Sequence, residues 1–346
     1  MNKTDKIFIT GATGFIGTTL VRQLLRDGYF VRGMSRFEPK LPPGFEGTSD
    51  ELWDHPNFEY VQGDVTDLES TRRGMNGCRF VIHMAGYAKN YAKDSKIYEQ
   101  ININGMRNVF IAAKEQKIEK IVWTSTIVTL GPTRRKEIGD ENMPRITTKY
   151  YTEYEETKSI AEKEAFRWIE QGLPLVIVNP TRVYGPGQLS EGNALAQLID
   201  DYRQGRAPFL LNAGINIGNY VLVDDVAKGH FLALEKGKIG ERYILGSENA
   251  SLGEFYRMID KVTGQKHWKI PVFRPGALIF ATIQKFWAKC FGTYPRITPG
   301  WVRTFLVDWA FSCDKAKREL GYDPVPLEEG LKRTCLWLDR IKSQKM

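Results

Sequence analysis

A glycine-rich turn near the start of the chain restricts most strongly what this sequence can form. The pattern G-x-x-G-x-x-G at Gly11–Gly17 follows an apolar strand predicted at Lys6–Thr10 and precedes a helix predicted at Thr18–Asp27. Glycine lets the backbone approach a pyrophosphate, and the free N–H groups that begin the next helix favour an anion there. The position between strand and helix therefore predicts a dinucleotide-binding unit, with a purely structural tight turn as the alternative.

Short apolar strands alternate with helices through the first half of the chain. Beyond the first strand and helix, strands are predicted at Tyr29–Ser35, Phe58–Gln62, Phe80–Met84, Lys120–Thr124 and Leu175–Asn179, with a helix at Ile97–Gln116. This alternation predicts an α/β fold, a Rossmann doubly wound parallel sheet. The segment Phe37–Asn57, rich in proline, glycine and acidic residues, is predicted to be an irregular surface insertion.

The pattern loosens beyond Asn179, which predicts a second unit. We expect an NADP(H)-binding Rossmann domain over residues 1–180, with further strand and helix pieces near 215–240. These pieces are a strand at Tyr220–Val223 and a helix at Asp225–Glu235, and a helix is also expected at Ala194–Arg203. Residues 181–346 are expected to form most of a smaller C-terminal substrate lobe, interleaved with the first domain.

Composition narrows the classes of function. The 346 residues carry a net charge of +8, and residues 261–346 hold 16 Lys+Arg against 7 Asp+Glu, so the excess positive charge lies there. This is either a solvated basic face or a surface for anionic lipid or a phosphorylated ligand; no nucleic-acid-reading motif accompanies it. The four cysteines are far apart, which argues against disulfides and a zinc site, and we expect no metal. With no targeting or spanning segment visible, we expect a cytoplasmic protein, with peripheral membrane contact as an alternative.

The end of the second strand bears on which dinucleotide binds. An Asp or Glu there holds the ribose 2′-hydroxyl in NAD-binding proteins, whereas this chain has Ser35-Arg36. A guanidinium pairs well with a 2′-phosphate, so the sequence favours NADP(H) over NAD(H). Arg36 could instead be an ordinary surface arginine or stack on adenine.

A tyrosine and a lysine four residues apart supply a candidate acid/base pair. Tyr154 and Lys158 share one face of a predicted helix, and a nearby ammonium is expected to lower the pKa of the phenol. The alternative is an exposed helical pair. Thr124-Ser125-Thr126 ends a strand at the sheet edge where such folds bind ligands, and a hydroxyl there can donate to a substrate oxygen; simple capping is the alternative.

Together these residues resemble the extended short-chain dehydrogenase/reductase family, in its NAD-dependent epimerase/dehydratase branch, over nearly the whole chain. The matching motifs are Thr10–Gly17, Gly63–Val65, His83–Gly86, Asn102–Gly105, Thr124–Thr126, Tyr154–Lys158, Val183–Gly187 and Tyr220–Ala227. Glu241–Gly246 and Ser312–Ala316 resemble a narrower group of dihydroflavonol-reductase-like, hopanoid-associated epimerase-like, farnesol-dehydrogenase-like and 3β-hydroxysteroid-dehydrogenase-like proteins.

The resemblance implies a role for each matching residue. Tyr154 is the expected acid/base, Lys158 its partner and a ligand of the nicotinamide ribose, Thr126 the hydroxyl donor, with Ser125 as a neighbour that could replace it. Asn102 supports the helix near the site. The dinucleotide is expected to contact Gly11, Thr13, Gly14, Phe15, Ile16, Gly17, Arg36, Asp64, Val65, Ala85, Gly86, Thr124, Tyr154, Lys158, Pro180 and Val183.

The substrate is less constrained than the cofactor. Gly276–Gly292 carries Ile279, Ile283, Phe286, Trp287 and Cys290 at helical spacing, and we expect a helix packed on the core of its own lobe, with a lid or an interfacial membrane helix as alternatives.

Three functions follow from these features. We expect an NAD(P)-dependent oxidoreductase acting on a carbonyl/alcohol pair of a hydrophobic small molecule. The alternatives are a nucleotide-sugar epimerase or dehydratase, whose diphosphate Lys269, Arg296 or Arg303 could hold, and a non-enzymatic dinucleotide sensor. The family resemblance also implies a homodimer through the helices at Ile97–Gln116 and Tyr154–Trp168.

Overall fold

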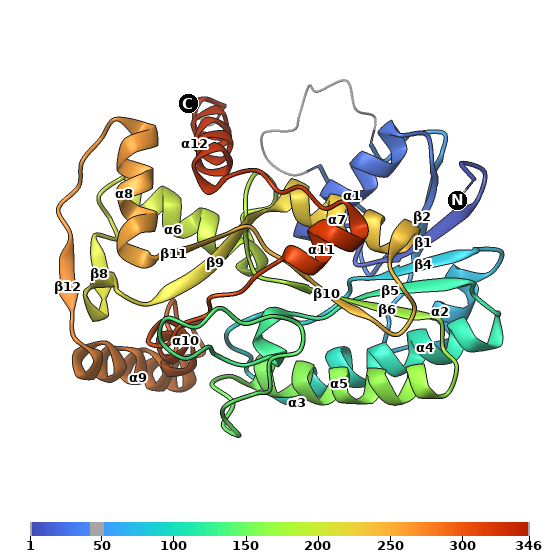
Figure 1. Ribbon diagram of the computed structural model, residues 1–346, viewed down its shortest axis with the longest axis horizontal. Helices are drawn as coiled ribbons and strands as arrows, with labels where there is room; N and C mark the ends of the chain where they lie inside the picture. Colours follow the sequence, from blue (N-terminus) through green and yellow to red (C-terminus); the bar gives the residue numbers. More distant parts are fainter. Residues whose placement is uncertain (1, 42–51, 345–346) are drawn as a thin grey trace.

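The computed structural model describes residues 2–41 and 52–344, and its centre is a parallel sheet (Figure 1). In this part of the chain the sheet has seven strands in the order β10-β6-β5-β4-β1-β2-β3, all parallel. The strands are β1 (Lys6–Thr10), β2 (Phe30–Ser35), β3 (Phe58–Gln62), β4 (Phe80–His83), β5 (Lys120–Thr124), β6 (Leu175–Pro180) and β10 (Arg242–Leu245). The predicted doubly wound Rossmann fold is confirmed.

Helices cover both faces of the sheet, which explains why its central strands β1, β4, β5 and β6 are mostly continuous apolar runs. On one face lie α1 (Phe15–Arg26), α7 (Val223–Lys236) and α11 (Asp314–Leu320), and on the other α2 (Leu68–Met75), α4 (Met106–Glu115) and α5 (Glu153–Glu170) (Figure 1). In β1, Ile7 and Ile9 pack into the first layer and Phe8 into the second, all fully buried. Chain order reverses between β1 and β4, and ligands bind at such a switch point.

The helix predicted over Ile97–Gln116 is irregular at its start. α3 (Lys96–Glu99) runs into a π-helical segment, η1 (Gln100–Gly105), and then into α4. π-Helical turns are rare and occur often at functional sites. This one carries Asn102, so the irregularity lies at a residue that the family resemblance places near the site.

The second lobe has its own small sheets and core. Its sheets join β11 (Glu248–Ser251), β9 (Ile217–Leu222) and β7 (Arg182–Tyr184), and β12 (Ile270–Val272) with β8 (Phe209–Leu211). Its helices are α6 (Ala194–Arg203), α8 (Leu252–Thr263), α9 (Arg274–Phe291), α10 (Pro299–Phe305) and α12 (Leu327–Ser343), with short 3₁₀ turns at η3 (Glu191–Asn193) and η4 (Asn212–Gly214). The predicted strand at 220–223 is part of β9 in this lobe, whereas α7, predicted at 225–235, packs back on α1. The lobes are therefore interleaved, and the domain boundaries stay a prediction.

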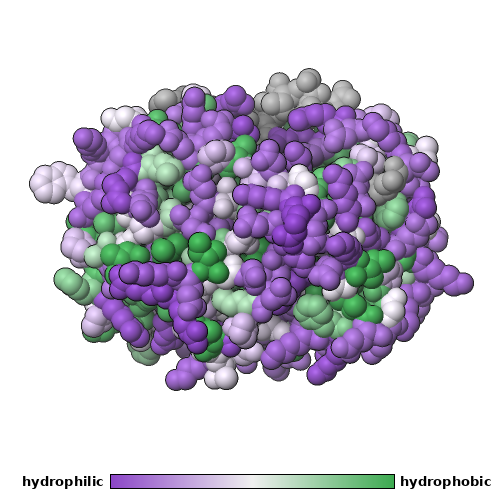
Figure 2. Space-filling model, viewed as in Figure 1, coloured by the Kyte–Doolittle hydropathy of each residue, from purple (hydrophilic) through white to green (hydrophobic). Residues whose placement is uncertain are grey.

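The expectation that Gly276–Gly292 packs on the core of its lobe is wrong. The helix forms as α9, but only Ala281 and Ala288 are buried along it, while Phe286 and Trp287 are 69% and 57% exposed. The small alanine side chains make the contact face and turn the bulky ones outward. Figure 2 shows hydrophobic residues gathered at the lower left, where α9 lies, among hydrophilic ones.

Ten residues of the predicted insertion Phe37–Asn57, positions 42–51, lie outside the described part of the chain. Across the described residues, no helix is long and apolar enough to cross a membrane, and no three His, Cys, Asp or Glu side chains gather as a metal site would require.

Candidate active site

The glycine turn after β1 has the shape that a pyrophosphate requires. Gly11 has φ of +73°, and a Cβ at this residue would lie 2.8 Å from the backbone nitrogen of Ala85. A Cβ on Gly17 would lie 2.0 Å from the carbonyl oxygen of Gly11. Helix α1 then begins at Gly14 with no side-chain cap and no acidic residue in its first turn. Its N–H groups and partial positive charge are therefore left for an anion.

A cavity of about 260 Å³ lies against this turn, at the carboxyl ends of the parallel strands. Eight of the predicted dinucleotide contacts line it: Gly11, Thr13, Gly14, Arg36, Asp64, Val65, Ala85 and Gly86. Phe15, Ile16 and Gly17 form the first turn of α1 beside it. The glycine cradle, the uncapped helix and the cavity fit an elongated dinucleotide. Met34, Phe37, Tyr87 and Ile101 also line the cavity and were not predicted, because apolar residues in such positions carry no motif.

Arg36 lies at the rim of this cavity, directly after β2. It is exposed, its guanidinium lies 5.7 Å from the centre of the Phe37 ring, and its backbone carbonyl accepts a hydrogen bond from the Gln62 amide. Within residues 2–41 and 52–344, no carboxylate lies within 4.0 Å of it. The exposed guanidinium therefore borders this end of the cavity.

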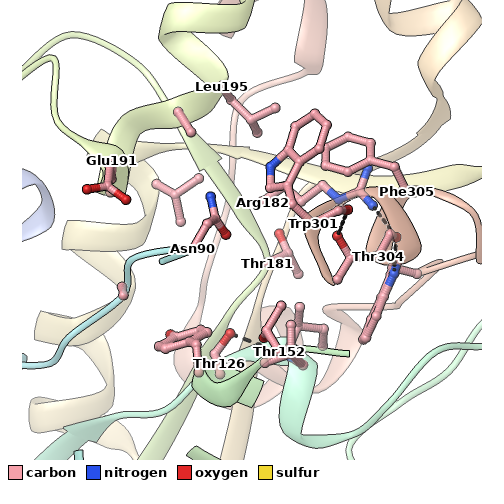
Figure 3. A pocket seen from close by; sticks show the side chains of 18 of the residues that line it. Asn90, Thr126, Thr152, Thr181, Arg182, Glu191, Leu195, Trp301, Thr304 and Phe305 are labelled. Carbon is pink, nitrogen blue, oxygen red and sulfur yellow. Dashed lines mark hydrogen bonds between the residues drawn. The ribbon is translucent and has the colours of Figure 1, made fainter. Parts of the chain in front are cut away.

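A second cavity, of about 220 Å³, contains the candidate catalytic tyrosine (Figure 3). Helix α5 begins at Thr152, whose hydroxyl accepts the backbone N–H of Glu155, and this cap directs the first turn, with Tyr154, toward the cavity. Burial raises the pKa of Tyr154 to about 12, although a hydrogen bond with the Thr126 hydroxyl acts in the opposite direction. The prediction that this pKa is lowered is therefore wrong for the protein without bound cofactor, because the effect of burial is larger than that of the hydrogen bond with Thr126.

Lys158 lies one turn further along α5 and is buried. Its ammonium donates to the backbone carbonyl of Thr124 at 2.8 Å and lies 4.1 Å from the centre of the Trp123 ring. Burial lowers the pKa of Lys158 to about 7, while the Glu162 carboxylate acts to raise it. The lysine therefore changes charge near neutral pH, beside Tyr154.

The three hydroxyls after β5 have different environments. The Thr124 hydroxyl donates to Nε2 of His230, because Nδ1 of that ring donates to the Val226 carbonyl. The Ser125 hydroxyl is buried and has no hydrogen-bond partner among the described residues. Thr126 lines the cavity with Tyr154. The arrangement therefore favours Thr126 over Ser125 as the hydroxyl that reaches a substrate.

Asn102 joins the loop after β4 to helix α5. Its carbonyl oxygen accepts the backbone N–H of Tyr87 at 2.8 Å, and its amide nitrogen donates to the Thr157 hydroxyl at 3.2 Å. One side chain thus connects the loop after β4, which lines the dinucleotide cavity, to the residue that precedes Lys158. Its contacts suit a positioning residue.

The remaining predicted residues lie at the boundary of the two lobes. Pro180 ends β6 and is buried. Val183 in β7 lines the cavity that contains Tyr154, which we call the catalytic cavity. Four residues that were not predicted also line this cavity and are labelled in Figure 3: Arg182, Glu191, Trp301 and Phe305. They come from three elements of the second lobe, β7, η3 and α10, and no motif connects them.

The chain is similar to known proteins over nearly its whole length. The profile of the NAD dependent epimerase/dehydratase family matches residues 7–246. A Synechocystis sp. protein with dihydroflavonol 4-reductase in its name is 31% identical, over 98% of this chain and 97% of its own length. The decarboxylating sterol-4-alpha-carboxylate 3-dehydrogenase of Saccharomyces cerevisiae is 26% identical, over 98% and 99%. The crystal structure of UDP-glucuronic acid 4-epimerase from Bacillus cereus in complex with NAD superimposes with a TM-score of 0.74 at 25% identity, over 99% and 100% of the two chains.

Proposed function

The chain belongs to the NAD dependent epimerase/dehydratase family, and from this membership we propose that it interconverts a carbonyl group and a secondary or allylic alcohol on a hydrophobic substrate. It is an oxidoreductase that uses a nicotinamide dinucleotide. The substrate class we propose is isoprenoid, steroid-like or flavonoid-like. Relatives with dihydroflavonol and sterol substrates in their names support this class.

The observation that carries the proposal is the meeting of Tyr154 and Thr126 in one cavity, with Lys158 buried beside them. When bound, the nicotinamide supplies or accepts hydride at the substrate carbon. Tyr154 and Thr126 hold the substrate oxygen. At neutral pH the phenol is protonated, so it donates its proton to the oxygen in the reductive direction. The charged form of Lys158 stabilises the phenolate that results.

Replacement of the tyrosine tests this assignment. Tyr154→Phe removes the proton but keeps the ring, and we expect kcat to fall by at least about 100-fold with dinucleotide affinity kept within about twofold. Tyr150→Phe, a neighbouring tyrosine outside the cavity lining, is the matched control. Turnover retained in Tyr154→Phe would show that another group is the acid.

The epimerase alternative has less support. None of the three basic residues that could hold a sugar diphosphate, Lys269, Arg296 and Arg303, lines the catalytic cavity, and Lys269 pairs with Asp260 at 2.5 Å. Nucleotide analysis of the denatured protein separates the two functions. Tightly held stoichiometric NAD favours the epimerase, and an exchangeable site favours the reductase.

We propose a preference for NADP(H), supported by the exposed guanidinium of Arg36 at the cavity rim. Fluorescence titrations with NADPH and NADH are expected to show at least tenfold tighter NADPH binding, which is about 1.4 kcal/mol. Arg36→Gln should remove this preference, whereas Arg73→Gln, an exposed arginine on α2, should keep it. Equal binding of both nucleotides by the unaltered protein would contradict the proposal.

We also propose that the outer face of α9 contacts an anionic membrane surface. Its exposed aromatic residues and the exposed Lys285 and Lys289 match the composition of an interfacial helix. We expect co-sedimentation with vesicles that contain phosphatidylserine, and its loss in the double variant Phe286→Ser, Trp287→Ser. Leu336→Ser, a 62% exposed leucine on α12, is the control. Absence of vesicle binding by the unaltered protein would refute the contact.

The homodimer through α4 and α5 and the cytoplasmic location stay predictions. Ile160 on α5 is 42% exposed, and a dimer interface would cover it. Sedimentation velocity of the protein and of Ile160→Glu tests the dimer.

A further inference from the structure

We propose that an apolar chamber on the other side of α10 from Tyr154 binds the hydrocarbon part of the substrate. The chamber has a volume of about 390 Å³, larger than the catalytic cavity, and a size typical of ligand pockets. This inference rests on the proposed function, because it takes the reacting oxygen to lie at Tyr154 and Thr126.

The chamber is built by elements of the second lobe. Side chains from α6, β8, α8, β12, α9 and α10 surround it, and its lining contains no charged, carboxamide or hydroxymethyl side chain. Burying a polar group there would cost free energy, since only Tyr256 and Trp301 bring polar side-chain atoms to the lining, whereas hydrocarbon would gain by leaving water. The chemistry of the lining therefore selects an aliphatic chain or a fused apolar ring system.

The chamber adjoins the catalytic cavity. Leu198, Trp301 and Phe305 line both cavities, so these three side chains form the partition between them. The Trp301 and Phe305 rings lie 4.4 Å apart, and Figure 3 shows them together on the side of the catalytic cavity away from Thr126. The two cavities are therefore neighbours, and the proposal takes a substrate held at Thr126 to pass between these side chains into the chamber.

The position of α10 fixes this connection. A Cβ at Gly300 would lie 2.5 Å from the carbonyl oxygen of Tyr151, so the glycine lets α10 pack directly on the segment before α5. Thr298 caps α10 by accepting the backbone N–H of Trp301 at 3.2 Å. The partition is thus attached to the same segment that orients the catalytic tyrosine.

The chamber also reaches the molecular surface. Phe209 and Phe280 line it and are 52% and 53% exposed. They lie on β8 and α9, so the proposal lets an apolar substrate enter the chamber beside α9.

A homologous series of straight-chain methyl ketones and the matching secondary alcohols tests the chamber. With NADPH, kcat/KM for the ketones should rise about fourfold for each added methylene that enters the chamber, as expected from about 0.8 kcal/mol per buried methylene. Binding of the alcohols, measured as thermal stabilisation of the protein with bound NADP, should rise with chain length in parallel, and this readout does not require turnover.

Two variants fill the chamber. Ala277 lines it, and Ala277→Phe should remove the gain for long chains while short ketones react as before. Gly276 also lines it, and an added Cβ there meets no atom within 4 Å, so Gly276→Leu is a second filling variant with little risk to folding. Ile283→Phe, at an exposed position of the same helix outside the lining, is the matched control.

The outcomes separate the two proposals. A chain-length gain in alcohol binding that the filling variants remove supports the chamber, even if no ketone is reduced, in which case only the proposed function fails. Reduction or binding with no chain-length gain overturns the chamber. A gain that is the same in the filling variants and in Ile283→Phe also overturns it.

Discussion

Replacing Lys158 by methionine should stabilise the protein at neutral pH while it impairs catalysis. Lys158 is buried, and burial lowers its pKa from 10.5 to about 7. At 1.36 kcal/mol for each pKa unit, this shift corresponds to about 5 kcal/mol by which the folded state disfavours the ammonium. Methionine keeps a similar unbranched stem and carries no charge to desolvate.

The sign of the pH dependence follows from proton counts. The unfolded chain holds the Lys158 proton up to pH 10.5, and the folded protein only up to about pH 7. Between these values the unfolded state binds one more proton, so the stability of the unaltered protein rises by about 1.4 kcal/mol for each pH unit. The destabilisation is complete below pH 7 and absent above pH 10.5.

The assay is urea unfolding of the two nucleotide-free proteins at several pH values. The stability advantage of Lys158→Met should shrink by about 2 kcal/mol between pH 7 and pH 9, since other titrating groups cancel in the comparison. Loss of the 2.8 Å bond to the Thr124 carbonyl subtracts about 1–3 kcal/mol at every pH, because that acceptor is left without its partner. A difference that does not change with pH would show that Lys158 keeps its ordinary pKa, and the account of its burial would fail.

Three further predictions concern the same site. Gly11→Ala should weaken dinucleotide binding at least tenfold by isothermal titration, because residue 11 has φ of +73° and a Cβ there would lie 2.8 Å from the Ala85 nitrogen; unchanged affinity would show that the turn can move away. Alcohol oxidation should become about tenfold faster for each pH unit up to about pH 7 and then level off, because oxidation needs the Tyr154 phenolate beside the charged form of Lys158, and Lys158 loses its proton above about pH 7; a rate that keeps rising to pH 10 would contradict this. Asn102→Ala should lower kcat about tenfold or more and shift the pH profile set by Lys158, whereas a merely structural role would lower the melting temperature and leave that profile unchanged.

The central sheet could be predicted because most of its strands are short apolar runs that alternate with helices. The predicted β1, β3, β5 and β6 match the observed bounds closely. For β1, β5 and β6 the reason is that a strand buried in the sheet must be apolar on both faces, whereas β3 is an edge strand and only half-buried. The strand at Arg242–Leu245 was absent from the strand predictions. It is only four residues long and follows a long helix, so its apolar run resembles a helix end as much as a strand.

The residues of the candidate site likewise fall into two groups, those that a sequence pattern reveals and those that it does not. Residues proposed to bind through local backbone geometry, such as Gly11 and Gly14, or to act through i,i+4 spacing, such as Tyr154 and Lys158, leave a pattern in the sequence. Trp301 and Phe305 leave none, because they reach the catalytic cavity only through the close packing of α10 on Tyr151. The pKa of Tyr154 was predicted in the wrong direction for the same reason: spacing places a lysine nearby, but burial depends on the whole fold.

The periodicity of apolar residues predicted helix α9 but not which of its faces is buried. The spacing of Ile279, Ile283, Phe286 and Trp287 indicated an apolar face correctly, and the inference that this face is buried was wrong. The buried positions are alanines, which add little to a hydrophobic pattern but allow close approach. One side of α9 therefore bounds the apolar chamber through Gly276, Ala277 and Phe280, and the rest of its apolar surface faces outward. The chamber therefore lies on one side of α9, and the proposed membrane contact lies on its outer side.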